Sequence, residues 1–275
     1  YVNTSSLSYR TGFVYFVDKN TTVYASIGSF FKPYRTLYSQ NTVYYNSKGN
    51  RFFPQENKEV FKPESGYQTE IGFTYSFLDY LKVNTSLFYI LKENSTQNLG
   101  TLEELNSEGV LVKKSIIGQV GVMDSKGFDI ELNITPIKSF FAIIGYSFTD
   151  ARYRDVKKNP FLEDFTNKGD RVTGVPESTF YSILSYDLSS ILSSGTSIDF
   201  NASYTDKVFR NYKTNLYYPS YLLAGCGVNY NLSSGVTLKL SIDNLFNKSY
   251  HDQSLGSQIV PGMPRSYRLS LRYAM

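Results

Sequence analysis

VTLKLSIDNLFNKSYHDQSLGSQIVPGMPRSYRLSLRYAM, residues 236 to 275, ends in a strict alternation of apolar and polar side chains. The apolar residues of the last segment occupy every second position: Tyr267, Leu269, Leu271, Tyr273 and Met275. This period of two predicts a β-strand with one apolar and one polar face. A strand that ends on an apolar residue, with no polar cap after it, is typical of the closing strand of a membrane barrel.

The segment before it, residues 236 to 243, repeats the pattern, and the polar faces of both segments carry charged side chains. A charge that faces lipid at the middle of a bilayer costs about 2–4 kcal/mol. The polar face is therefore expected to look into a water-filled lumen, and the apolar face is expected to meet hydrocarbon.

Composition supports an all-β chain of 275 residues with 25 Tyr and 20 Phe. The mean hydropathy is negative, −0.29, and no run of about 18 apolar residues predicts a membrane helix. The single cysteine excludes an internal disulfide and a cysteine-rich metal site. The net charge of +4 is spread along the chain without a basic run, so no nucleic-acid partner is predicted.

About eleven strands are expected, and their connections alternate between short turns and long loops, as in transmembrane up-and-down barrels. Long polar loops are expected at residues 32–65, 93–113 and 150–175, and one unbroken strand is expected at 116–134. Bacterial single-chain barrels have even strand numbers, so eleven strands predict an arc of a larger barrel. The chain also opens in mid-pattern at Tyr1 without a signal peptide, which suggests the back part of a longer protein.

Five motifs, in matching order, resemble those of TonB-dependent outer-membrane receptors. One is the C-terminal signature, in which an Asn-Leu-Phe motif ends the penultimate strand and a Pro-Arg motif opens the last: SIDNLFNKSY (241–250) followed by PGMPRSYRLSLRYAM (261–275). Of the others, FKPESGYQTEIGFTYSF (61–77) resembles the "lys-pro-glu" strand of the family, and MDSKGFDIELNI (123–134) resembles the strand with a Gly-aromatic-acid motif. GYSFTDARY (145–153) resembles the strand that follows it. SIGSFFKPYR (26–35) resembles an earlier strand that enters a ligand loop. The last has the form common among ferric-siderophore receptors. The chain departs from the family in ending with Met275 instead of an aromatic residue and in lacking Trp.

The resemblance implies a 22-stranded barrel with an N-terminal plug in the outer membrane of a Gram-negative bacterium. Residues 1–275 would be the C-terminal part of one barrel domain, with the plug and the TonB box absent from this chain. The implied ligand is a ferric siderophore, whose iron stays in the chelate, so that the protein itself binds no cofactor. The implied partners are the TonB complex, through the missing N-terminal part, membrane lipid and lipopolysaccharide. The chain alone is predicted to be inactive.

Catalysis and direct metal binding are not favoured by the residues present. The only histidine, His251, is expected in a loop and has no Gly-rich nucleophile elbow nearby. With Asp252 it could form a metal pair, but two adjacent residues rarely supply enough ligands. We therefore interpret His251 as an exposed loop residue and predict neither an enzyme nor a metal site.

A siderophore receptor needs aromatic faces and cations to grip a bulky, often anionic chelate. Two expected loops carry such residues, which are the candidate ligand-binding side chains: Tyr34, Arg35, Tyr38, Phe209, Arg210 and Tyr212. The alternative is that these are ordinary interfacial aromatics or solvated loop residues.

Charged side chains on the predicted polar face form a second candidate set: Glu70, Asp129, Glu131, Asp199, Lys239, Asp243, Arg268 and Arg272. They either pair across strands and are solvated inside the barrel, or contact the plug. Asp243 and Arg268 lie on adjacent predicted strands and could pair if the register allows.

The sequence therefore predicts part of a receptor for TonB-dependent uptake of a ferric siderophore. The alternatives are a passive porin or structural barrel, or a related receptor for another ligand such as cobalamin or a glycan. An upstream reading frame that codes for a plug would favour the receptor, and a signal peptide directly before Tyr1 would favour the porin.

Overall fold

A computed structural model describes residues 7–33, 42–45, 51–52, 61–119, 121–156, 166–192, 195–211, 214–233, 235–255 and 258–273. Its main element is an eleven-stranded antiparallel sheet in which each strand lies beside its neighbours in chain order. The strands are β1 (Arg10–Phe16), β2 (Thr21–Lys32), β5 (Glu64–Phe77), β6 (Leu81–Glu93), β9 (Gly121–Ile134), β10 (Phe140–Val156), β11 (Ser178–Asp187), β12 (Thr196–Thr205), β15 (Tyr221–Ser233), β16 (Val236–Asp243) and β19 (Ser266–Tyr273). The predicted up-and-down order of about eleven strands is confirmed.

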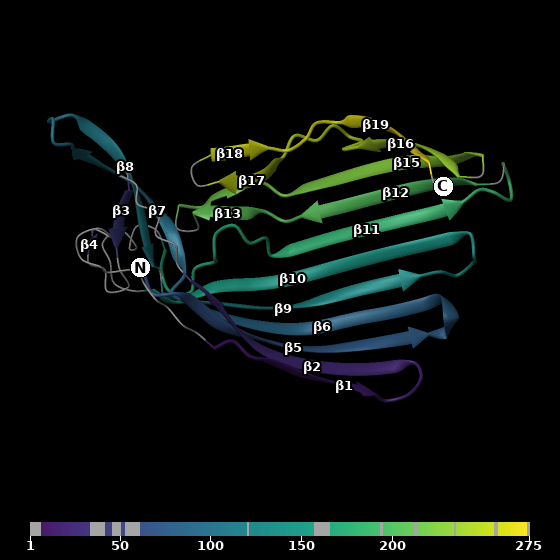
Figure 1. Ribbon diagram of the computed structural model, residues 1–275, viewed down its shortest axis with the longest axis horizontal. Coiled ribbons are helices and arrows are strands. Elements are labelled where there is room, and N and C mark those ends of the chain that lie inside the picture. The colour runs from purple at the N-terminus through teal and green to yellow at the C-terminus, as the bar shows by residue number, and fades with distance from the viewer. Residues whose placement is uncertain are drawn as a thin grey trace.

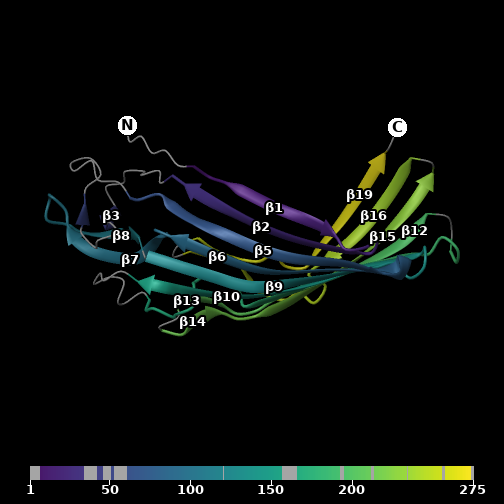
Figure 2. The same ribbon diagram turned by 90° about the horizontal axis from the view of Figure 1, so that it is seen from below.

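The sheet is curved and open. β1 and β19 are its two edges, and seen from below both rise on the same side of the strands between them (Figure 2). Short connections join the strands at one end, here called the short-turn end, for example the 3₁₀ turn η1 (Leu78–Tyr80). The longer excursions lie at the opposite end, the long-loop end (Figure 1).

The register gives the sheet two chemically different faces. On one, the apolar face, large side chains are exposed although they are hydrophobic: Leu87 is 60% exposed, Phe200 41% and Leu271 68%. In the described part of the chain, these rows are not covered by a second sheet or by helices. Within that part, no helix is long and apolar enough to cross a membrane.

At the long-loop end four strands form a separate layer, here called the outer sheet. They are β3 (Thr42–Tyr45), β4 (Arg51–Phe52), β7 (Thr96–Leu105) and β8 (Leu111–Gln119), in the order β4-β3-β8-β7. Two small hairpins, here called the paired hairpins, extend neighbouring strands of the arc at the same end (Figure 1). They are β13 (Val208–Asn211) with β14 (Leu216–Tyr218), and β17 (His251–Leu255) with β18 (Gln258–Pro261).

The predicted single strand at 116–134 is wrong. β8 ends at Gln119 and pairs with β7 and β3, whereas β9 begins at Gly121 and joins the arc. Gly121 has a φ of +108°, a backbone conformation that glycine adopts without a steric penalty. The residues expected to be loop at 93–113 are mostly strand, and β10 continues to Val156 into the region expected to be a charged loop.

The main packed cluster lies where the outer sheet meets the upper parts of β9 and β10. Its buried members are Leu99, Ile116, Met123, Ala151, Tyr153 and Val172. Tyr153 has no exposed surface, and its backbone N–H donates to Asp170 O at 3.0 Å. The core therefore stabilises the long-loop end of the molecule, above the two-faced part of the sheet.

Candidate functional site

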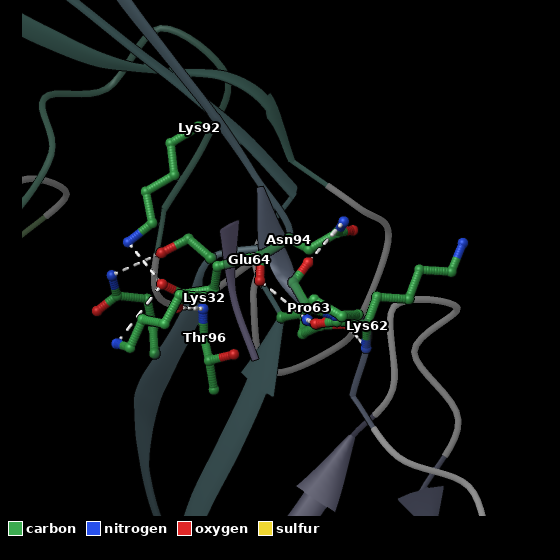
Figure 3. Close-up of polar contacts among 10 residues, drawn as sticks. Lys32, Lys62, Pro63, Glu64, Lys92, Asn94 and Thr96 are labelled. Atoms are coloured by element: carbon green, nitrogen blue, oxygen red, sulfur yellow. Dashed lines mark hydrogen bonds and ion pairs between the residues drawn. The ribbon is translucent and has the colours of Figure 1, made fainter. Parts of the chain in front are cut away.

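The outer sheet is attached to the arc through Glu64, the last residue of the Lys-Pro-Glu motif and the first of β5. Its carboxylate is buried, at 5% exposure. It lies 3.0 Å from Lys92 Nζ and 3.7 Å from Lys32 Nζ, and it accepts a 2.9 Å hydrogen bond from the backbone N–H of Thr96 (Figure 3). Burial alone would raise the pKa of Glu64, but the Thr96 hydrogen bond and the two ammonium groups hold this pKa below its ordinary value.

Gln119 completes this attachment from the end of β8. Its side chain is 2% exposed. Its Nε2 donates to Lys62 O at 2.6 Å and to Asn94 O at 2.9 Å, and its Oε1 accepts from the Lys62 backbone N–H at 3.2 Å. Asn94 Nδ2 donates to Pro63 O at 3.3 Å. The Gln119 carboxamide thus forms hydrogen bonds with backbone groups of two chain segments. We call Glu64, Gln119 and Asn94 together the anchor.

An aromatic pair continues the attachment toward β3. Phe61 and Tyr44 are 2% and 3% exposed, and their rings meet edge to face at 6.0 Å. Ile117 of β8 packs against them. The stretch FKPE therefore places a buried ring and a buried carboxylate on either side of one proline, where the chain enters the arc.

The structure describes two of the six predicted ligand-binding residues. Tyr34, Arg35, Tyr38 and Tyr212 lie outside the described residues. Phe209 and Arg210 lie on β13. The Phe209 ring is 9% exposed and packs edge to face on Tyr217 at 5.9 Å.

Cations lie over the rings of this hairpin. Lys207 Nζ is 5.4 Å from the Phe209 ring centroid and 5.6 Å from that of Tyr217. Arg210 Cζ is 5.6 Å from the Tyr218 ring, a distance within the range of a cation–π interaction. The hairpin thus combines aromatic faces with two cations, which is the chemistry expected for gripping an anionic chelate.

The stack crosses from one of the paired hairpins to the other. His251 lies 4.8 Å from Tyr218, with the two rings close to parallel at 28°, and Tyr221 lies 4.7 Å from Tyr250. A Cβ atom on Gly262 would come within 2.1 Å of Tyr250 Cζ, so glycine permits this close approach. The interpretation of His251 as an exposed loop residue is wrong, because it is half-buried, begins β17 and is covered by a ring.

The Asn-Leu-Phe motif also has a structural role. Asn244 is 7% exposed and has a φ of +51°. Its Nδ2 donates to Lys248 O at 2.9 Å and to Met263 O at 3.0 Å, and its Oδ1 accepts from the Lys248 N–H at 2.8 Å. This asparagine closes the turn after β16 and ties it to the segment that leads into β19.

The charged residues of the polar face are partnered in two ways. Asp199 accepts from Lys239 at 3.2 Å and from Asn229 at 2.7 Å, and Arg268 donates to Asp243 at 3.3 Å. No ion pair of Arg272 is found within the described ranges. Ion pairing across strands therefore accounts for Asp199 and Asp243.

Glu70, Asp129 and Glu131 have neutral partners in the described part of the molecule. Tyr24 donates to Glu70 at 2.7 Å, Tyr181 donates to Glu131 at 2.5 Å, and Ser147 donates to Asp129. Glu131 also accepts from two asparagine side chains. A hollow of about 440 Å³ lies here, lined by Tyr24, Asn84, Asp129, Glu131, Ser147 and Tyr181 among others. Across the described ranges, no group of three or more His, Cys, Asp or Glu side chains could hold a metal ion.

A family model described as "TonB dependent receptor-like, beta-barrel" matches residues 1–245. The chain is 25% identical to the ferric-pyoverdine 358 receptor of Pseudomonas putida over 267 residues, covering 95% of this chain and 28% of that protein. It is 25% identical to the ferrioxamine B receptor of Salmonella typhimurium over 250 residues, covering 90% of this chain and 31% of that protein.

Among solved structures, the siderophore receptor PiuA from Acinetobacter baumannii matches with a TM-score of 0.71 and 22% identity. The match covers 97% of this chain and 35% of PiuA. The chain thus spans about a third of the length of these proteins. The predicted membrane-barrel fold is confirmed, and the arc seen here is an open part of such a barrel.

Proposed function

This chain belongs to the TonB-dependent receptor-like β-barrel family, and we propose that it forms part of the wall of an outer-membrane receptor that takes up a ferric siderophore. The family is a receptor and transporter family of the Gram-negative outer membrane, not an enzyme family. Residues 1–275 would all belong to one barrel domain, and a plug and the contact with TonB would be supplied by other parts of the receptor. The names of the relatives from Pseudomonas and Salmonella support a siderophore as the ligand.

One observation carries the proposal: aromatic and cationic side chains gather at the long-loop end of an arc whose apolar face is exposed along its length. An exposed apolar face of this extent suits a bilayer, and a polar opposite face suits a water-filled lumen. The long-loop end would then face the outside of the cell. Ligand capture would occur there.

The proposed grip binds the organic shell of the chelate and leaves the iron inside it. Arg210 and Lys207 would offer positive charge to an anionic chelate, and the rings of the paired hairpins would offer flat apolar surfaces. Tyr34, Arg35, Tyr38 and Tyr212 remain predicted members of this site. Because Phe209 is buried under its neighbours, its proposed role is to support the hairpin from within.

The polar face would meet the plug at the hollow around Glu131. The carboxylates there accept hydrogen bonds from hydroxyl and amide groups and form no ion pair among the described residues, so a basic partner on the plug would pair with them. Asp199 and Asp243 already pair with cations of the same face, and Arg272 would be free to contact the plug. The plug contact is therefore proposed first for Glu70, Asp129 and Glu131.

The test uses the full-length receptor and a panel of radiolabelled ferric hydroxamate and catecholate chelates. Arg35→Ala with Tyr38→Ala, and separately Lys207→Ala with Arg210→Ala, should each weaken binding by about tenfold, which corresponds to about 1.4 kcal/mol. Lys19→Ala with Lys138→Ala, at the short-turn end, is the matched control. Surface abundance should not change in any variant.

Unchanged binding in both test variants would remove these residues from the site. Uptake measured in cells without TonB separates the receptor from a passive porin. The receptor should lose uptake there and retain binding. Uptake that persists without TonB would contradict the proposal and favour the porin.

A further inference from the structure

The outer sheet ends in a strand that is paired on one side only. β7 pairs with β8, and no second strand lies beside it in the described part of the chain. The backbone N–H of Asn106 donates to Val110 O at 2.9 Å, which sets the phase of this hairpin. Because antiparallel strands alternate between hydrogen-bonded and non-bonded pairs, the backbone groups of Thr101, Glu103 and Leu105 point away from β8. No other described segment offers them a backbone hydrogen bond.

Residues 101–105, here called the open edge, form a short segment with defined ends. On the side of the arc, the register of β7 shifts between Asn98 and Gly100. Gly100 has a φ of +125° there, and its N–H donates to Asn98 Oδ1 at 2.9 Å. On the other side the chain turns into β8, and this hairpin extends beyond the strands of the arc at the long-loop end (Figure 1). Five residues are a typical strand length, so the open edge can pair with one added strand.

Apolar side chains are exposed at the tip of the same hairpin. Leu105 and Leu111 lie directly opposite each other in the register, and they are 66% and 59% exposed. Val110, beside Leu111, is 55% exposed. Leu102 lies on the other face of the hairpin, where it packs against the core. An aliphatic side chain on an added strand would therefore cover Leu105 and enlarge an apolar cluster that is already present.

The charges of this hairpin are sorted by strand. β7 carries Glu103 and Glu104, and β8 carries Lys113 and Lys114. Glu103 lies 3.5 Å from Lys113, and Glu104 lies 3.1 Å from Lys114. A strand added to the open edge would thus lie next to the acidic strand. Because opposite charges stabilise a strand pair and like charges destabilise it, the added strand should be basic opposite the two glutamates.

The same charges disfavour pairing of β7 with a second copy of itself. The antiparallel register that joins the leucines sets Leu102 of one copy opposite Leu105 of the other. In that register Glu103 lies opposite Glu104, and like charges directly opposite are destabilising. Charged side chains on edge strands commonly prevent such self-pairing. The open edge therefore disfavours its own sequence but accepts a basic strand.

We propose that the open edge binds an extended basic segment of another protein, which adds a strand to the outer sheet. The main chain of this segment would pair with Thr101, Glu103 and Leu105. Two basic side chains would lie opposite the glutamates, and an apolar side chain would cover Leu105. Since the long-loop end faces the outside of the cell in the proposed function, the partner would be a protein that reaches the cell from outside. The proposal takes this orientation from the proposed function and does not depend on siderophore transport.

The experiment measures amide hydrogen exchange of the full-length receptor in detergent, with and without the synthetic peptide acetyl-Thr-Val-Lys-Lys-Val-Thr-amide. In an antiparallel register its lysines lie opposite Glu104 and Glu103, and a valine lies opposite Leu105. With about 1 mM peptide, exchange of the N–H groups of Thr101, Glu103 and Leu105 should slow about fivefold, as when about four-fifths of the sites are occupied. The N–H groups of Leu102 and Glu104 face β8 and should change little.

Two further peptides are matched controls. A peptide with glutamates in place of the two lysines should not slow exchange, because its charges repel those of β7. A peptide N-methylated at its second, fourth and sixth residues keeps every side chain but lacks the N–H groups that would face β7. It should not slow exchange either, because strand addition depends on main-chain hydrogen bonds.

Two variants of the receptor test the site itself. Glu103→Lys with Lys113→Glu keeps the cross-strand pair and the net charge, but it reverses the charge beside the open edge. It should weaken binding of the basic peptide about fivefold. Glu103→Pro removes one outward N–H group and should abolish the slowing. Binding of ferric chelates by both variants should be unchanged, so that failure of this site and failure of the receptor function give different results.

Three outcomes would overturn the proposal. Unchanged exchange with the basic peptide would mean that the open edge takes no such strand. Equal slowing by the acidic or the N-methylated peptide would mean that neither the charges nor the main chain recognises the segment. Slow exchange of the three outward N–H groups in the receptor without peptide would show that another part of the receptor already covers the open edge.

Discussion

The outer sheet and the paired hairpins stand at the same end of the arc, but they are held there by different interactions. The outer sheet is fixed by the anchor and by a core that contains a fully buried tyrosine. The paired hairpins are joined to each other by ring stacks, and several of the rings in this region remain exposed, such as Tyr217 at 42%.

The two kinds of attachment differ in how strictly they fix the position of the attached region relative to the arc. A buried carboxamide with all its partners in place tolerates little displacement, because each broken hydrogen bond leaves a buried polar group unpaired. Stacked rings can slide over one another at small cost in energy. We therefore expect the outer sheet to be the rigid part of the long-loop end and the paired hairpins to be the part that adjusts to a ligand.

The largest effect should come from emptying the core beneath the outer sheet. Tyr153→Ala removes a side chain with no exposed surface and should lower the free energy of opening of the outer sheet by about 3–5 kcal/mol. Amide hydrogen exchange of β7 and β8 measures this opening. Tyr217→Ala, the same change at an exposed ring, should leave hydrogen exchange of β7 and β8 unaffected. Equal effects of the two substitutions on β7 and β8 would contradict the proposed difference between the outer sheet and the paired hairpins.

The anchor should come next. Gln119→Leu keeps the volume but leaves the Lys62 N–H and the carbonyls of Lys62 and Asn94 without their partner. The opening free energy of β7 and β8 should fall by about 2–3 kcal/mol. Gln68→Leu, at an exposed position of β5, is the matched control, and a Gln119→Leu protein with parental exchange would show that the core alone holds the sheet.

Acid should loosen the outer sheet and leave the paired hairpins unchanged. The pKa of Glu64 is lowered in the folded protein, so its stabilisation is complete above the unfolded-state pKa and is lost as the pH falls through the lower folded value. Exchange protection of β7, corrected for intrinsic rates, should therefore drop across that acidic window. Glu64→Gln should abolish this dependence and cost about 1–2 kcal/mol at neutral pH.

Equal acid sensitivity of the Glu64→Gln protein would assign the transition to another carboxylate. Equal loss of protection in β13 and β17 would mean that both regions respond to acid together.

The periodicity of the sequence predicts the strands of the arc, but it does not predict the outer sheet or the contacts between the paired hairpins. Alternation in residues 266–273 and 66–77 predicts strands because a two-faced sheet imposes a period of two. Ile116, Val122 and Phe128 keep one phase across the break between β8 and β9, so the pattern could not reveal that the first part of this stretch pairs with another sheet. Gly121, with its positive φ, was the available signal.

The attachments at the long-loop end show the same limit. Glu64 and Asn244 lie within recognisable sequence motifs, but their hydrogen-bond partners, the Thr96 N–H and the Met263 carbonyl, are distant in the sequence and are seen only in the folded structure. Gln119 carries no sequence signal, because its role depends on two chain segments meeting around one buried carboxamide. The stack of Tyr218 on His251 joins residues 33 positions apart, which no local pattern predicts.

The smallest effect is expected where the two hairpins meet. Tyr218→Leu replaces the ring between Arg210 and His251 and should weaken the coupling of the hairpins by about 0.5–1.5 kcal/mol. A double-mutant cycle with His251→Leu measures this coupling through hydrogen exchange of β17 and β18. Tyr218→Phe should cost nothing, because the Tyr218 hydroxyl is buried with no hydrogen-bond partner among the described residues. A coupling above about 3 kcal/mol would make this contact as firm as the anchor, and the paired hairpins would then not be the adjustable part of the long-loop end.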